Sequence, residues 1–159
     1  MQMLKDAFME MGLIIKTAVA NKIFITTFSA WAFAQTLKVV LHFISHRRID
    51  FRLLVGTGGM PSSHTAFVSA LATSIGLACG WNSPLYLVTL GFTIVVITDA
   101  VGVRRAAGKQ ARLLNRMIDE MYKQEDEDFP ERLKELLGHT PIEAAAGILL
   151  GILSVIVLS

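Results

Sequence analysis

The sequence predicts an all-α polytopic membrane helix bundle with about four spans, and three observations support this prediction. The chain has 159 residues, the size of one domain, and 53% of them are hydrophobic, with a mean hydropathy of +0.53. The apolar residues are collected in long uncharged runs, and basic residues cluster beside these runs. We therefore treat residues 1–159 as a single membrane-embedded domain.

Residues 23–37, 66–78 and 85–97 contain no Asp, Glu, Lys or Arg, and residues 142–158 contain a single one, Glu143 near the start. With flanking residues, each run approaches the roughly 20 residues that a membrane-spanning helix needs, although the second and third are short. The alternative is the core of a soluble four-helix protein, for which such runs are unusual. We expect spans at about residues 23–45, 62–79, 84–100 and 141–158.

Residues 1–20 carry apolar side chains at helical spacing, separated by charged residues such as Lys5 and Glu10. This pattern predicts an amphipathic helix at the membrane interface or packed on the bundle. An incomplete first span is the alternative, so the side of the membrane on which the N-terminus lies stays open.

The first span contains Lys38, an ionisable residue where the bilayer makes a charge costly. Either its ammonium group reaches the lipid headgroups, or it faces the bundle interior and binds an anion. Arg47 and Arg48 follow the span, which indicates a cytoplasmic location for this end by the positive-inside rule.

The second span begins at Gly-Gly-Met-Pro-Ser-Ser-His-Thr, residues 58–65. Pro61 has a backbone φ that suits a first helical turn, so it predicts the helix start. The glycines allow close approach of a ligand, and free N–H groups with the hydroxyls of Ser62 and Ser63 favour an anion such as phosphate. His64 adds a group that exchanges protons near neutral pH. The alternative is an ordinary helix start with serine caps and a surface histidine.

The third span ends at Asp99 and is followed by Arg104 and Arg105, a second basic cluster at an expected cytoplasmic end. Residues 101–139 form the predicted cytoplasmic insertion. Its first part, residues 101–123, has apolar residues at helical spacing and a basic face, so we expect an amphipathic helix suited to anionic headgroups.

The last span starts at Thr140, with Pro141 at the first helical position and Glu143 at the third. This is the pattern of a capping box. Gly147 and Gly151, four residues apart, offer a flat face for close helix packing.

Alternating spans bring polar residues from four parts of the chain to the same helix ends. Cations, helix N-termini and histidines suit phosphoryl transfer, because the charge on phosphoryl oxygens must be held while one group attacks and another is protonated. Two histidines permit a covalent route. Glu143, one turn beyond His139, either orients that imidazole or only caps the helix. The converging residues are Lys38, Arg47, Arg48, Ser62, Ser63, His64, Asp99, Arg104, Arg105, His139 and Glu143.

Three segments, Gly58–Ala66, Asp99–Arg105 and Gly138–Glu143, resemble a known family. They are similar to the divergent branch of the type 2 phosphatidic acid phosphatases, relatives of the acid phosphatases and vanadium haloperoxidases. The resemblance covers nearly the whole chain after about residue 20. It implies a metal-independent phosphatase of membrane lipids with a phosphohistidine intermediate, no cofactor, a lipid phosphate as substrate and no nucleic-acid partner.

The resemblance also implies roles for individual residues. His139 would be the nucleophile, Glu143 its orienting carboxylate and His64 the proton donor to the leaving group. The implied phosphate-binding residues are Lys38, Arg47 or Arg48, Ser62 and Ser63.

The chain departs from the family pattern in several places. The spacing from Lys38 to Arg47 is longer than usual, no proline follows the arginine, and a serine replaces the glycine of the second motif. No Ser-Arg pair precedes His139 at the usual distance, so either Arg104 or Arg105 supplies the missing cation or the site lacks it. The bundle is shorter than the six helices of the superfamily, which leaves open that a homodimer completes the pocket.

The leading prediction is an integral membrane phosphatase that acts on a lipid phosphate or diphosphate at the cytoplasmic side of the plasma membrane. The alternative is a phospholipid- or phosphate-binding membrane protein without turnover. A third hypothesis is a transporter subunit that uses Lys38 and Asp99 as an intramembrane pair. Asp99 and Glu143 are weak evidence for magnesium, so we predict no metal.

Overall fold

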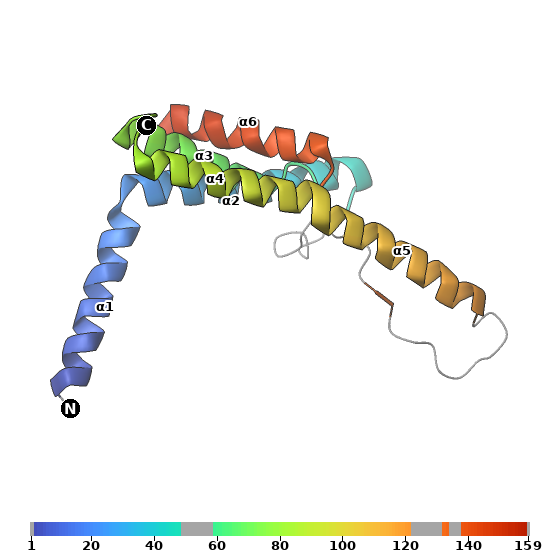
Figure 1. The fold of residues 1–159 in the computed structure, drawn as a ribbon, viewed down its shortest axis with the longest axis horizontal. Helices are drawn as coiled ribbons and strands as arrows, with labels where there is room; N and C mark the ends of the chain where they lie inside the picture. The colour runs from blue at the N-terminus through green and yellow to red at the C-terminus, as the bar shows by residue number, and fades with distance from the viewer. Residues whose placement is uncertain (1, 49–58, 122–131, 134–137, 159) are drawn as a thin grey trace.

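The computed structural model describes residues 2–48, 59–121, 132–133 and 138–158, and the regular structure in these ranges is entirely helical (Figure 1). Three helical segments are long and apolar enough to cross a membrane, and a shorter apolar helix accompanies them. The chain is the all-α membrane helix bundle that the sequence predicts. The elements are α1 (Gln2–Ala20), α2 (Lys22–His46), α3 (Ser63–Cys79), α4 (Pro84–Thr98), the π-helical turn η2 (Asp99–Val103), α5 (Arg104–Met121) and α6 (Pro141–Leu158).

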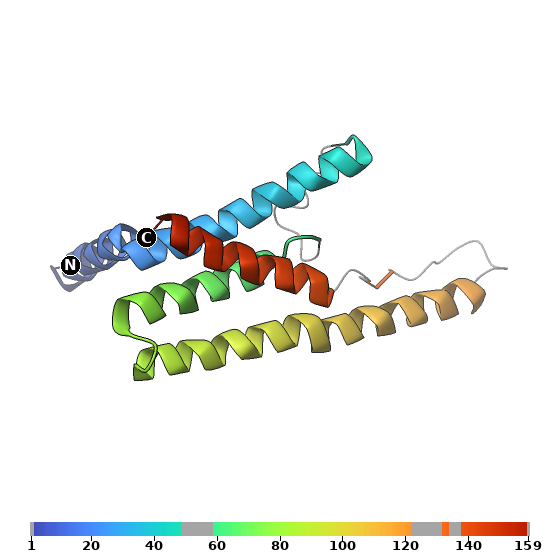
Figure 2. The same ribbon diagram turned by 90° about the horizontal axis from the view of Figure 1, so that it is seen from above.

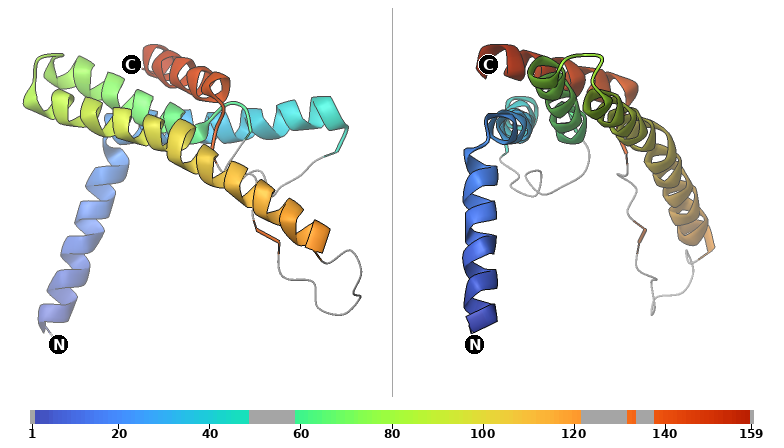
Figure 3. Two further views of the ribbon diagram at one scale, coloured as in Figure 1. Left: turned by 45° about the vertical axis from the view of Figure 1, so that its right-hand side comes forward. Right: turned by 60° about the vertical axis from the view of Figure 1, so that its left-hand side comes forward.

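The bundle is built around α3, which packs against α2, α4 and α6. Figure 3 shows α3 between α2 and α4, with α6 lying across it. Glycines on α6 allow a close approach, because a Cβ on Gly147 would overlap the Thr65 hydroxyl and one on Gly151 would overlap the Ala66 carbonyl oxygen. The flat glycine face predicted for the last span is therefore the face that packs on α3.

The start of α3 differs from the start predicted at Pro61. The helix begins at Ser63, two residues later, and the Ser62 side chain caps it by accepting a hydrogen bond from the Thr65 N–H at 3.4 Å. Ser62 has extended backbone angles, with φ −70° and ψ 116°, so the proline before it lies outside the helix.

α4, η2 and α5 form one continuous helical rod, Pro84–Met121, instead of a span with a separate helix after it (Figure 2). The boundary that the sequence suggests near residue 100 is a π-helical turn. No proline interrupts the chain between residues 85 and 121, and alanine and arginine after the turn favour helix, so the rod continues. Figure 1 shows α5 extending away from the bundle.

α1 is the helix predicted for the first twenty residues, and it leaves the bundle at its junction with α2 (Figure 1). Large apolar side chains along it are exposed, among them Leu4, Phe8 and Ile14. Exposed apolar residues on an amphipathic helix suit the membrane interface, which is one of the two locations that the sequence suggests.

Candidate active site

The N-termini of α3 and α6 meet at one end of the bundle. The Ser62 N–H donates to the Glu143 carbonyl oxygen at 3.1 Å, and the Thr65 hydroxyl oxygen lies 3.1 Å from the Ala144 carbonyl oxygen. Thr65 is fully buried, so this junction belongs to the core. Each helix N-terminus attracts anions through its N–H groups and its dipole. The junction therefore fixes two such termini next to each other.

His139 is held between the start of α6 and the η2 turn. Its N–H donates to the Ala100 carbonyl oxygen at 2.9 Å, and its side chain is 4% exposed. Gly138 before it has a φ of +83°, and a Cβ there would overlap the Arg105 backbone. His139 Nδ1 lies 3.3 Å from Glu143 Oε2, which leaves Nε2 as the ring nitrogen that the carboxylate does not engage.

Glu143 also caps α6. Its Oε2 accepts a hydrogen bond from the Thr140 N–H at 3.0 Å, and its own N–H donates to the Thr140 hydroxyl oxygen at 3.3 Å. These are the reciprocal bonds of the predicted capping box. Because the same carboxylate oxygen contacts His139, the two alternatives for Glu143, capping and contact with the imidazole, occur together.

His64 faces His139 across this end of the bundle. The two ring centroids are 6.3 Å apart and the ring planes are inclined by 50°. His64 lies in the first turn of α3 and is exposed, whereas His139 is buried. An atom midway between the rings would lie close to the distance of about 3–3.5 Å from which a nucleophile attacks.

The η2 turn contributes an ion pair to the same place. Arg104 Nε donates to Asp99 Oδ2 at 2.6 Å. A cavity of about 30 Å³ is bounded by this pair and by both histidines. Single π-helical turns inside longer helices are frequent at functional sites. The residues that line the cavity are His64, Val96, Asp99, Ala100, Arg104, Gly138 and His139.

Lys38 lies inside the bundle, not at the lipid headgroups. It is 2% exposed, and its Nζ donates to Gln35 Oε1 at 2.8 Å. The charges of Lys38 and Arg104 act on both imidazoles, and Lys38 also attracts the Glu143 carboxylate. The site therefore combines a buried cation and an exposed cation with the histidine pair.

Burial lowers the pKa of His139 below its ordinary value of 6.5. The hydrogen bond and charge of Glu143 oppose this change, while the positive charges of Lys38 and Arg104 add to it. Because the net direction is downward, His139 is neutral at pH 7. A neutral imidazole has the lone pair that a nucleophile needs.

The structure brings several of the predicted site residues together and leaves others apart. Ser62 and Ser63 are buried beneath the start of α3, and the Ser62 hydroxyl serves as the helix cap. Arg47 and Arg48 are exposed at the C-terminal end of α2, which diverges from α6 (Figure 2). The predicted residues that gather around the histidine pair are Lys38, His64, Asp99, Arg104, His139 and Glu143.

The position of the arginines follows from helix geometry. Arg47, the residue after α2, lies nine positions beyond Lys38, which carries the arginine about 13 Å further along the helix axis. In the part of the chain that the structure describes, Arg47, Arg48 and Arg105 do not line the cavity. Arg104 is therefore the arginine that the fold supplies to it.

Sequence reasoning missed Gln35 and Thr65. Gln35 is buried and bonds the Lys38 ammonium. The sequence could have indicated this contact, because Gln35 is a polar residue in an apolar run and lies three positions before Lys38, on the same helix face. The Thr65 contact with Ala144 joins residues 79 positions apart, so no local pattern could have indicated it.

Within the described ranges, no three His, Cys, Asp or Glu side chains form a group that could hold a metal ion. Among the described residues, Asp99 and Glu143, the two carboxylates considered as magnesium ligands, therefore have no third side chain of these types beside them.

The fold and this cavity define a class of protein: a helical membrane protein with two histidines, two carboxylates and two cations gathered at one end of its spans. The chain belongs to the divergent PAP2 family, whose model matches residues 19–154. It is 43% identical over 145 residues to the uncharacterized membrane protein YuiD of Bacillus subtilis (strain 168), an alignment that covers 85% of this chain and 92% of that protein. No solved structure matches the chain. The resemblance found in the sequence is thus confirmed.

Proposed function

We propose that this protein is an integral membrane phosphatase that hydrolyses a phosphomonoester or diphosphate of a lipid through a phosphohistidine intermediate, without a metal ion. One observation carries the proposal: His139, with Glu143 at its Nδ1 atom, faces His64 across a single cavity. Membership of the divergent PAP2 family supports the same class of reaction.

In the first step, the Nε2 lone pair of neutral His139 attacks phosphorus. The Nε2–P bond forms while the P–O bond to the lipid breaks, and the leaving oxygen takes a proton from the His64 imidazolium, which the bound phosphoryl anion stabilises against the positive charges of Lys38 and Arg104. Glu143 accepts the hydrogen bond of the Nδ1 proton and stabilises the positive charge that His139 acquires. The lipid alcohol leaves, and the phosphoryl group remains on His139.

In the second step, water attacks the phosphorus of phosphohistidine. His64, now neutral, takes a proton from the water as the P–Nε2 bond breaks and inorganic phosphate leaves. The exposure of His64 gives water a route to this position. Both imidazoles then return to their starting protonation states.

The negative charge on the phosphoryl oxygens is balanced by Lys38, Arg104 and the N-termini of α3 and α6. Arg104 takes the place of the arginine that the family pattern puts before His139, because it lines the cavity from another part of the chain. Lys38 is buried, and a buried cation stabilises such charge far more than one in bulk solvent.

We assign the reaction to the cytoplasmic leaflet of the plasma membrane. The basic residues after α2 and those after η2 flank the end of the bundle that holds the cavity, and basic residues favour the cytoplasmic side. Candidate substrates are phosphatidylglycerophosphate, phosphatidate and isoprenyl phosphates.

A second candidate function is the binding of a phospholipid or phosphate without turnover. Asp99 favours it, because its carboxylate lines the cavity and lies 2.6 Å from Arg104 Nε. The carboxylate repels a phosphate and shares the cation that the phosphate needs. Such a protein would bind the lipid phosphate and release no inorganic phosphate.

The test is phosphate release by the purified, detergent-solubilised protein from a panel of lipid phosphates, with and without EDTA. We expect release that survives the chelator and falls by at least about 10³-fold in His139→Ala. His42→Ala is the control, because His42 lies on α2 beside the Arg48 carbonyl oxygen, at 3.3 Å, outside the cavity lining. Binding of a lipid phosphate with no release from any substrate would support the second candidate instead.

A further inference from the structure

An apolar groove adjoins the histidine cavity. It has a volume of about 270 Å³ and is walled by α2, α3 and α4. His64 and Val96 line both the groove and the histidine cavity, so the two spaces meet at these side chains. The other lining residues are Phe28, Trp31, Phe67, Val68 and Phe92, all of them apolar.

The groove runs away from the polar end along α3. Phe67 and Val68 lie one helical turn beyond His64, and Phe92 lies one turn before Val96 on the antiparallel helix α4. Phe28 and Trp31 of α2 close the opposite side, with ring centroids 5.2 Å apart. A long apolar molecule that starts at His64 would therefore follow the groove into the region of the membrane spans.

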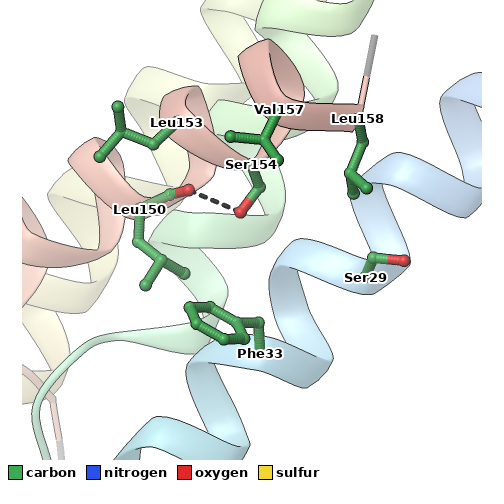
Figure 4. A pocket seen from close by; sticks show the side chains of 7 residues that line it. All are labelled: Ser29, Phe33, Leu150, Leu153, Ser154, Val157 and Leu158. Atoms are coloured by element: carbon green, nitrogen blue, oxygen red, sulfur yellow. Dashed lines mark hydrogen bonds between the residues drawn. The ribbon is translucent and has the colours of Figure 1, made fainter.

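A second apolar groove is larger than the groove beside His64, so volume alone does not indicate where a hydrocarbon chain binds. It has a volume of about 380 Å³ and lies between α2 and α6, where Phe33 and Leu150 point toward one another and Leu153 also contributes to the lining (Figure 4). It shares no lining residue with the histidine cavity. A hydrocarbon chain in this second groove would have no contact with the reacting groups.

We propose that the groove of Phe28, Trp31, Phe67 and Phe92 holds the hydrocarbon chain of the lipid phosphate whose phosphoryl group lies between His64 and His139. The inference rests on the proposed function for its headgroup and goes beyond it by locating the tail. A phosphate ester without a chain would leave the aromatic wall unused and lose the affinity that its burial provides.

Trp31 gives a direct readout of the chain, because the protein has two tryptophans and the other is Trp81. In Trp81→Phe, all tryptophan fluorescence comes from Trp31. This variant is placed in lipid nanodiscs with a small fraction of a phosphatidate phosphonate analogue that cannot be hydrolysed and carries bromine in its chains. The same fraction of chain-brominated phosphatidylcholine is the control for bulk lipid.

We expect the brominated phosphonate to quench Trp31 more strongly than brominated phosphatidylcholine, since its doubly charged phosphonate group mimics the phosphate monoester held at the histidines and the phosphocholine diester does not. Equal quenching by the two lipids would overturn the inference. The readout does not depend on turnover, so it separates the two proposals. Selective quenching without phosphate release refutes the phosphatase alone, and phosphate release with equal quenching refutes the tail site alone.

A matched pair of variants sharpens the test in the active protein. Phe92 and Phe33 are both exposed helix residues, at 54% and 58%, and each lines one of the two grooves. Phe92→Ala should lower the ratio of kcat/KM for octyl phosphate to kcat/KM for ethyl phosphate by about tenfold. Phe33→Ala should leave that ratio unchanged. Equal ratios in the two variants would contradict the assignment of the tail to the Phe92 groove.

Discussion

The two ends of α3 are built in different ways. At its N-terminal end, Ser62 and Thr65 are buried, and hydrogen bonds join them to the backbone of α6. At its C-terminal end, the ring of Trp81 packs over Gly76 and meets Tyr86 edge-on, with centroids 5.1 Å apart. One end is joined by directional polar contacts and the other by apolar packing.

This difference indicates where the molecule is organised for a ligand. Burying a polar group costs free energy unless a hydrogen bond compensates for it, so apolar packing is the simpler way to close a bundle. The polar construction appears where two helix N-termini, two histidines and two cations also meet. Variants at the two ends should therefore have different consequences.

Glu143→Gln should have the largest effect among these variants. The amide oxygen can still accept the Thr140 hydrogen bond, so the cap is kept, but the charge beside His139 is lost. We expect phosphate release to fall by about 10²-fold with little change in thermal stability, because the positive charge on His139 is no longer stabilised. Steady-state kinetics and a melting curve in detergent measure the two quantities. Equal loss of stability and activity would indicate that Glu143 is only a cap.

Arg104→Ala should lower kcat/KM by about tenfold, because the cavity loses a cation that faces the phosphoryl group. Arg105→Ala is the matched control, since the neighbouring arginine does not line the described cavity. The comparison uses phosphate release under the same conditions for both proteins. The same loss in both variants would mean that only the net positive charge of this segment matters.

Gly147→Ala should destabilise the fold by about 1–3 kcal/mol, because its Cβ would overlap the Thr65 hydroxyl and the Ser62 carbonyl oxygen in the junction of α3 and α6. Gly76→Ala at the other end of α3 meets only the ring of Trp81, which can move aside, so its effect should be smaller. Unfolding midpoints in detergent measure both changes. A larger loss in the Gly76 variant would reverse the proposed contrast between the ends.

The smallest of these expected effects is a shift in the pH dependence of kcat/KM. Since burial lowers the pKa of His139, the acidic fall of kcat/KM should lie below pH 6.5. Glu143 raises this pKa, so Glu143→Gln should move the fall to still lower pH. The unfolded chain binds a proton at His139 more readily than the folded protein does. The free energy of unfolding that this residue contributes above pH 6.5 is therefore lost as the pH falls. An acidic fall above pH 6.5 would contradict a neutral buried His139.

The sequence was sufficient to predict the helices and the end of the bundle where the histidines meet. Uncharged runs indicate spans directly, and alternation of spans then assigns His64 and His139 to the same end. The capping box of Thr140 and Glu143 could also be predicted from the sequence, because its two residues are close in the chain and have a fixed spacing.

The choice among the arginines could not be predicted, since it depends on how helices diverge in space. Arg47 and Arg48 are close to Lys38 in sequence, yet the straight course of α2 carries them past the cavity. Arg104 reaches the cavity because α4 continues through a π-helical turn, which no single residue signals. The groove beside His64 likewise arises from three helices that meet only in the folded bundle.

Rapid-quench trapping of the phosphoenzyme would show whether His139 carries the phosphoryl group. Purified protein is mixed with a lipid phosphate that it hydrolyses, quenched under alkaline conditions and digested for mass spectrometry. We expect an acid-labile phosphoryl group on His139 in the wild type and none in His139→Ala. Phosphate release that continues in His139→Ala, or a phosphoryl group on any other residue, would show that His139 is not the nucleophile.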